Sequence, residues 1–176
     1  MERRIVIKQV LILAAGLTLL PSCLKQQGKS TVLLKNLNVS LDQEYILAEI
    51  AETLIPKTDT PGAKQLNLHL FVLKMLDDCY ENSDQKKFMS GLGQFEDHTH
   101  QLYNKSFKDL PRPQQLVLLN ELDHQQDIVN DLSVFYKILK SRTIDGYLNS
   151  KYVMTNLIIW ELVPGRYTGY FPVKSA

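Results

Sequence analysis

Residues 40–56 have the sequence SLDQEYILAEIAETLIP, and this stretch decides the fold class. Ser40 followed three residues later by Gln43 is the capping-box pattern that begins a helix. The apolar residues then recur at helical spacing: Leu47, Ile50, Ala51 and Leu54. Pro56 ends the pattern, because proline cannot continue a helix. The stretch therefore predicts a helix with one buried face.

The rest of the chain repeats this helical pattern. We expect a helical turn at residues 59–63 and further helices at 68–80, from Asn82 or Ser83, from Pro111 and Pro113, at 131–145 and, more briefly, at 150–157. Gly146 is the expected C-terminal cap of the helix at 131–145. The inward-facing residues are Phe88, Leu92, Phe95, Thr99, Leu102, Leu118, Leu119, Leu122, Leu132, Phe135, Tyr136 and Leu139. No stretch alternates with a period of two, so we predict an all-α fold: a compact bundle of about five to six helices over residues 40–176.

The composition excludes several classes of protein. The chain has 176 residues, of which 44% are hydrophobic and 22% are charged, so it is neither disordered, collagen-like nor a multi-span membrane protein. It carries 20 basic and 19 acidic residues, and a net charge of +1 gives no electrostatic case for binding nucleic acid. Two cysteines are too few for a scaffold held by disulfides.

The first 22 residues have the pattern of an export signal. Two arginines, Arg3 and Arg4, precede an uncharged and mostly apolar run, Val10 to Leu20, which is shorter than the roughly 20 residues that span a bilayer. The run ends in Leu20-Pro-Ser-Cys23, the lipobox pattern of a bacterial lipoprotein, which predicts lipidation of Cys23. The alternative is an uncleaved helical anchor that ends near a cysteine.

The paired arginines also fit twin-arginine export, the route of proteins that fold before they cross the membrane. The match is incomplete, because Glu2 stands where serine or threonine is usual and Val6 stands where phenylalanine is usual. An ordinary secretory signal remains the alternative. Residues 23–39 are expected to be a lipidated tether, with a short extended segment at 31–34. The exported chain is close to neutral, so its partners are selected by shape and apolar contact.

Once Cys23 is lipidated, Cys79 is the remaining thiol. It shares a helical face with Val72, Met75 and Leu76, which predicts a buried core cysteine. The alternative is an intermolecular disulfide with a partner subunit.

The sequence supplies no catalytic constellation. The four histidines, His69, His98, His100 and His124, have no metal-ligand spacing and are expected at the solvated surface. Glu96 and His100 are four residues apart, but no further ligand accompanies them. Nucleotide-binding loops and nucleophile elbows are absent from the sequence, and carboxylate pairs such as Asp77 and Asp78 are expected on solvated helix faces. We therefore assign no catalytic, cofactor-binding or metal-binding residues and expect a non-catalytic module.

The C-terminal segment 160–172 is rich in aromatic residues, glycine and proline and cannot be a regular helix. Tryptophan, tyrosine and arginine are enriched at binding hot spots. We place a partner interface at Trp160, Pro164, Gly165, Arg166 and Tyr167. The alternative is a tail that folds back and covers the domain's own core.

Three motifs carry a resemblance to a known family. They are TLIPKTDTPGA at residues 53–63, MLDDCY at residues 75–80 and VPGRYTG at residues 163–169. In order and spacing they resemble the gluconate 2-dehydrogenase subunit 3 family, over roughly residues 40–172, and the twin-arginine start is typical of that family. We assign Thr60 and Pro61 of the first motif to the partner interface.

The resemblance implies a non-catalytic small subunit of an exported FAD-dependent sugar or polyol dehydrogenase. The large subunit of such a complex belongs to the glucose–methanol–choline oxidoreductase family and holds the FAD, and a cytochrome c subunit often completes it. The small subunit carries the export signal and helps the flavoprotein to mature. With the lipobox, this places the chain at the periplasmic side of a bacterial membrane, anchored by lipid, whereas many relatives have a plain signal. The alternative is a free-standing periplasmic lipoprotein that acts as a binding module or chaperone.

Overall fold

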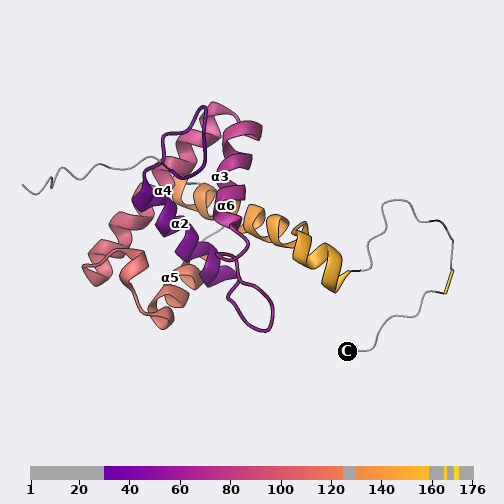
Figure 1. Ribbon diagram of the computed structural model, residues 1–176. Helices are drawn as coiled ribbons and strands as arrows, with labels where there is room; N and C mark the ends of the chain where they lie inside the picture. The colour runs from indigo at the N-terminus through magenta and orange to yellow at the C-terminus, as the bar shows by residue number, and fades with distance from the viewer. Residues whose placement is uncertain (1–29, 125–129, 159–164, 166–168, 171–176) are drawn as a thin grey trace, which may run out of the picture.

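The computed structural model describes residues 30–124, 130–158, 165 and 169–170 (Figure 1). The helices, labelled as in Figure 1, are α2 (Leu41–Leu54), α3 (Leu68–Cys79), α4 (Asn82–Tyr103), α5 (Arg112–His124) and α6 (Asp131–Leu148). A 3-10 turn, η1 (Phe107–Asp109), and a π-helical turn, η2 (Val153–Leu157), complete the set. The described part contains no strand, so the expected all-α bundle is confirmed. Within that part, no helix has the length and apolar character to cross a membrane.

Helix α2 begins where the capping box predicts. The Ser40 hydroxyl accepts the Gln43 N–H at 3.2 Å, and the Gln43 side chain accepts the Ser40 N–H at 3.0 Å. The helix ends at Leu54, ahead of Pro56, as expected. Helix α3 runs back beside α2, so the two helices form a hairpin. Residues 55–67 connect them at one end, and residues 30–39 lie at the other end.

Phenylalanines from three elements form the centre of the core. The rings of Phe88 on α4 and Phe135 on α6 meet edge to face with centroids 5.0 Å apart. Phe95 on α4 lies 5.1 Å from Phe107 of η1 and 5.9 Å from Phe135. All four are fully buried, so α4 and α6 pack along the stripe that the sequence predicts.

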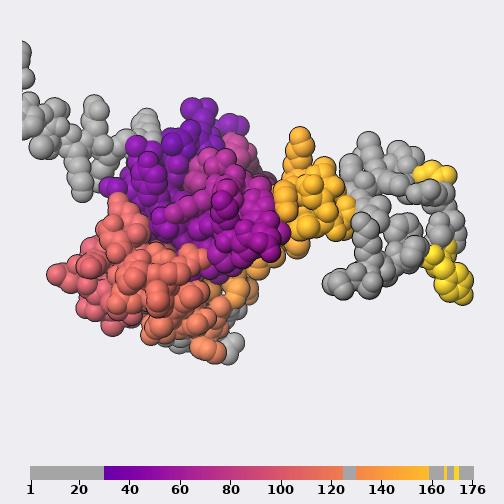
Figure 2. All heavy atoms as spheres, turned by 60° about the horizontal axis from the view of Figure 1, so that its bottom comes forward, coloured from indigo at the N-terminus to yellow at the C-terminus, as the bar shows by residue number. Residues whose placement is uncertain are grey.

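The second half of α6 extends beyond the bundle and continues into η2 (Figure 1). We call residues 144–158 the arm. Figure 2 shows it in orange as a lobe beside the main body. Only one side of α6 faces α3 in this region, so the other side of the arm is open to solvent.

Three details of the helices differ from expectation. Gly146 is not a cap: α6 continues to Leu148, and a Cβ on Gly146 would lie 2.7 Å from the ring of Phe71 on α3. The glycine therefore allows α3 and α6 to cross closely. Leu102 is 52% exposed, because it lies in the last turn of α4, beyond the last buried residue of that helix. Helix α4 takes Glu81 as its N-cap, since the Glu81 carbonyl accepts the N–H groups of Asp84 and Gln85.

Two connecting segments also differ. Residues 59–62 form bends and irregular backbone in place of a helical turn, and the hydrogen-bonded turn covers residues 63–67; residues 31–34 form no strand. Residues 30–39, expected to be part of a tether, instead pack against the helices through Val32, Leu34 and Leu37. Residues 30–39 are therefore packed on the bundle.

Candidate functional site

Loop 55–67 joins α2 to α3 and contains most of the first motif. Glu52, in the last turn of α2, accepts the Lys57 N–H at 3.0 Å with one carboxylate oxygen and the Lys64 N–H at 2.8 Å with the other. The Ala63 N–H also donates to the Ile55 carbonyl at 2.9 Å. The loop is thus closed across its base by one side chain and one backbone bond.

Gly62 makes this closure possible. A Cβ at this position would lie 2.5 Å from the backbone nitrogen of Lys57 and 2.6 to 2.7 Å from the Glu52 carboxylate oxygens. Any side chain would therefore displace the carboxylate from the amides that it binds. The motif needs glycine here for close approach, a role that the turn pattern alone does not reveal.

The end of α2 is tied to α5 by Arg112. Its guanidinium donates to the Glu52 carbonyl and, at 2.9 Å, to the Thr53 hydroxyl. This satisfies a carbonyl that the helix end leaves unpaired. Gln115 continues the network, with its amide oxygen 3.1 Å from the Thr53 hydroxyl and its amide nitrogen donating to the Phe107 carbonyl at 3.1 Å. Sequence reasoning missed both α5 residues, because their partners lie about 60 residues earlier.

Of the predicted interface residues, Thr60 and Pro61 lie in this loop and are half-buried. The Thr60 hydroxyl is 3.2 Å from the hydroxyl of Tyr147 on α6, which joins the loop to the arm. The tip of the loop, residues 56–59, is exposed. Loop and arm are therefore neighbours, and both have exposed residues.

The arm exposes large apolar side chains: Ile144, Leu148, Leu157 and Ile158, at 41% to 55% of their area. The first two lie four residues apart on α6 and share one of its sides. Exposed apolar side chains that cluster on one element mark interaction surfaces more often than isolated ones do. Gly165 is exposed with no atom near its Cβ position, and the other interface residues predicted in the tail, Trp160, Pro164, Arg166 and Tyr167, lie outside the described residues.

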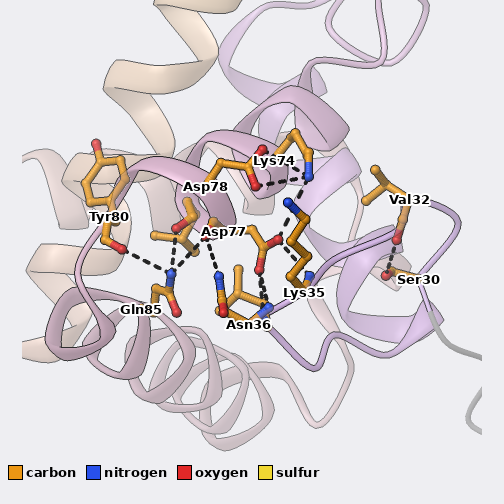
Figure 3. Close-up of polar contacts among 11 residues, drawn as sticks. Ser30, Val32, Lys35, Asn36, Lys74, Asp77, Asp78, Tyr80 and Gln85 are labelled. Atoms are coloured by element: carbon orange, nitrogen blue, oxygen red, sulfur yellow. Dashed lines mark hydrogen bonds and ion pairs between the residues drawn. The ribbon is translucent and has the colours of Figure 1, made fainter.

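Loop 30–39 is held at the opposite end of the α2–α3 hairpin by Asp77 (Figure 3). The Asp77 carboxylate accepts the N–H groups of Lys35 at 2.8 Å, Asn36 at 2.7 Å and Leu37 at 2.9 Å. Burial by itself would raise the pKa of the Asp77 carboxyl, but these donors and the nearby Lys74 ammonium outweigh it and lower the pKa below its ordinary value. Asp77 is 2% exposed, so the expectation of a solvated carboxylate pair is wrong.

Gln85 completes this corner. Its side-chain nitrogen lies 3.0 to 3.2 Å from the carbonyl oxygens of Leu76, Asp77 and Tyr80, at the C-terminal end of α3 (Figure 3). These carbonyls have no partner within the helix, and a buried amide supplies one. Asp77 of the second motif, residues 75–80, therefore holds loop 30–39 on the bundle.

Cys79 is exposed, so the expectation of a core thiol is wrong. The buried side of α3 is centred on Leu73 and Leu76, and Cys79 lies at its edge in the last residue of the helix. An intermolecular disulfide stays a prediction.

The prediction of a solvated side chain is also wrong for His69, which is only 9% exposed. Burial lowers the pKa of its imidazole, and Glu44 offsets that shift only in part. Glu96, considered beside His100, accepts the Ser106 hydroxyl at 2.9 Å and thereby supports η1. The described residues contain no group of three or more side chains able to hold a metal ion.

Comparison with known proteins identifies one family. The family model described as gluconate 2-dehydrogenase subunit 3 matches residues 41–165. The match spans α2 to α6 and the arm, and it includes the carboxylates Glu52 and Asp77 that hold the two loops. No curated protein matches the chain, and no solved structure does.

Proposed function

The chain belongs to the gluconate 2-dehydrogenase subunit 3 family, and from this premise we propose that it is the non-catalytic small subunit of an exported FAD-dependent dehydrogenase. Family membership indicates an accessory subunit of a dehydrogenase complex. In the proposal, a large subunit of the glucose–methanol–choline type holds the FAD, and a cytochrome c subunit is a further candidate member of the complex. This chain assists the export and maturation of the flavoprotein. The family match over most of the helical domain is the observation that carries the proposal.

A binding role agrees with how the polar residues in and beside the first two motifs are used. Glu52, Thr53 and Asp77 are polar residues of the kind that could serve in catalysis, but each is engaged with backbone groups that hold a loop or a helix end. The Asp77 carboxylate in particular is a poor general base, since three N–H donors stabilise its charged form and lower its pKa. The motifs therefore build a surface and leave the chemistry to the partner.

The surface offered to the flavoprotein combines loop 55–67, the arm and the tail that follows the arm. The loop supplies a rigid polar edge at residues 56–59, and the arm supplies apolar side chains beside it. Interfaces commonly pair an apolar centre with a polar rim. In the proposal Trp160, Arg166 and Tyr167 extend this surface as anchors.

The export part of the proposal rests on the first residues of the sequence. FAD is loaded in the cytoplasm, so a partner that carries it has to cross the membrane folded. The proposal assigns this passage to the twin arginines Arg3 and Arg4 and the final anchoring, on the periplasmic side, to a lipid on Cys23. A single acyl chain holds a protein only marginally at a membrane, whereas the two or more chains on a lipoprotein cysteine anchor it stably.

Replacing Arg3 and Arg4 by lysine keeps the positive charge and removes the paired guanidinium groups. We expect this chain and the flavoprotein to remain together in the cytoplasm, as measured by cell fractionation and flavin absorbance. Continued arrival of both in the periplasm would favour an ordinary secretory route.

Purification of the tagged chain from its own membranes tests the subunit assignment itself. A glucose–methanol–choline flavoprotein in a fixed molar ratio is the expected result, and this chain separated from it should have no flavin absorbance. Recovery of the chain alone would favour a free-standing lipoprotein, and stoichiometric FAD in the separated chain would contradict the accessory role.

A further inference from the structure

We propose that loop 30–39 rests on the lipid bilayer through Leu33 and fixes the orientation of the domain at the membrane. The inference rests on the lipid anchor at Cys23 that belongs to the proposed function. It adds a second contact to the anchor, made by the folded domain itself.

The loop is a built structure and not a passive linker. It is closed at its base by the Ser30 N–H, which donates to the Val39 carbonyl at 3.0 Å. Besides Asp77, a second buried carboxylate holds it: Glu44 of α2 accepts both the backbone N–H and the hydroxyl of Thr31 at 2.6 Å. Figure 1 shows the loop at the top of the bundle, beside the end of α3.

Within this loop the side chains alternate in burial. Val32 and Leu34 pack against the core, and Leu33 between them is 86% exposed. No other aliphatic side chain in the described part of the chain is exposed to this extent. Because Val32 and Leu34 on either side pack against the core, the side chain of Leu33 between them faces the surroundings.

The short chain between Cys23 and Ser30 limits how far loop 30–39 can lie from the bilayer. Six residues separate Cys23 from Ser30. Fully extended, seven Cα steps span at most about 25 Å. A domain tied to the bilayer at Cys23 therefore keeps the base of loop 30–39 close to the lipid surface. Loop 55–67 lies at the other end of α2, about 20 Å further along the helix axis, and stays free for the flavoprotein.

The chemistry of the segment also fits a lipid surface. An exposed leucine gains free energy by entering the boundary between headgroups and acyl chains. Lys35 is exposed two residues further on, and the sequence places Lys25 and Lys29 between the anchor and the loop. Lysines at this position favour the phosphate groups of anionic lipids.

Spin labels at two positions test the proposal on the full, lipidated chain. The exposed Cys79 is first changed to serine. Leu33→Cys then carries one label, and Leu102→Cys, near the far end of α4, carries the matched control. The labelled proteins are bound to vesicles of phosphatidylethanolamine and phosphatidylglycerol, and collisions with oxygen and with a water-soluble nickel chelate are compared. We expect oxygen to dominate several-fold at position 33 and the nickel chelate to dominate at position 102.

Two results would overturn the inference. The first is a chain that sediments with vesicles but whose labels at both positions are accessible to the nickel chelate. This would support the anchor and contradict the contact through Leu33. Shielding of position 33 only after the flavoprotein is added would show that a protein covers the loop. If the chain fails to sediment with vesicles at all, the proposed anchor fails, and this contact fails with it. An unchanged melting temperature of L33C confirms that the label has not unfolded the loop.

Discussion

Loops 30–39 and 55–67 lie at opposite ends of the α2–α3 hairpin, and both are held by carboxylates that accept backbone N–H groups. Asp77 binds three consecutive N–H groups and is 2% exposed. Glu52 binds two N–H groups that are seven residues apart and is half-buried. The same chemistry thus serves two different tasks.

The difference lies in what else holds each loop. Loop 55–67 is connected at both ends to helices of the bundle, so Glu52 mainly sets its shape. Within the described residues, loop 30–39 is connected to a helix only at its C-terminal end, and Asp77 and Glu44 attach it to the domain. We therefore expect a change at Asp77 to act on stability and a change beside Glu52 to act more on partner binding.

Replacing Asp77 by alanine has the largest expected effect. The N–H groups of residues 35–37 lose their acceptor at the edge of the core, and a buried unpaired group costs about 1 to 3 kcal/mol. We expect the free energy of unfolding to fall by about 3 kcal/mol and the melting temperature by roughly 10 °C. Denaturant titration followed by circular dichroism measures both the loss and its cooperativity.

Asp78 provides the matched control on the same helix. Its partner is Lys74, one turn earlier, at 3.0 Å in a partly exposed ion pair. Such pairs contribute about 0.3 to 0.5 kcal/mol, so Asp78→Ala should leave the stability nearly unchanged. Equal losses in the two variants would show that Asp77 does not attach the loop.

Substitution of Gly62 by alanine tests the other loop. The new methyl group would collide with the Lys57 nitrogen and the Glu52 carboxylate, and relief of such overpacking costs about 1 to 3 kcal/mol. We expect a smaller loss of stability than for D77A and a clear loss of affinity for the flavoprotein, measured by co-purification. Full affinity in G62A would remove loop 55–67 from the proposed surface.

Gly93 is the control for this glycine. It lies on the exposed side of α4 with no atom near its Cβ position. Alanine in a helix interior is more stable than glycine by about 0.5 to 1 kcal/mol. Gly93→Ala should therefore raise the melting temperature and leave flavoprotein binding unchanged, and a destabilised G93A would contradict the packing described for α4.

Acid should weaken the attachment of loop 30–39 by part of the free energy lost in D77A. The pKa of Asp77 in the folded chain lies below 3.8, its ordinary value. The unfolded chain therefore takes up this proton first as the pH falls, and the stability that Asp77 contributes is complete above 3.8 and lost as the pH falls through the folded pKa. We expect the stability difference between the wild type and Asp77→Asn to stay constant at higher pH and to shrink below 3.8. A constant difference at all pH values would mean that the charge of Asp77 contributes nothing.

The sequence predicts the helices of this protein better than it predicts the role of its carboxylates. The capping box at Ser40, the stop at Pro56 and the buried stripe of Phe88, Leu92 and Phe95 are local patterns, and all are found in the structure. Periodicity and capping depend on residues within a few turns of one another, so a sequence carries them directly.

The partners of Asp77 and Glu52 cannot be predicted in this way. Asp77 is next to Asp78, and the two residues look alike in the sequence, but only one meets N–H groups that come from 40 residues earlier in the chain. A backbone donor leaves no mark on the sequence, since every residue except proline carries one. The same limit explains Cys79, whose exposure depends on where α3 ends relative to its neighbours.

The smallest expected effect comes from the bond that joins loop 55–67 to the arm. Tyr147→Phe removes the hydroxyl that meets Thr60 at 3.2 Å and keeps the ring that packs beside Ala63 and Leu68. A partly exposed hydrogen bond of this kind contributes about 1 kcal/mol or less, so the melting temperature should fall by only a few degrees. If the flavoprotein contacts loop and arm together, the free energy of binding should fall by more than the free energy of unfolding. The reason is that loop and arm are no longer held in one relative position. The exposed Tyr45 on α2 gives the control, and Tyr45→Phe should change neither quantity. Equal binding by Y147F and the wild type would show that loop and arm act separately, or that one of them does not contact the partner.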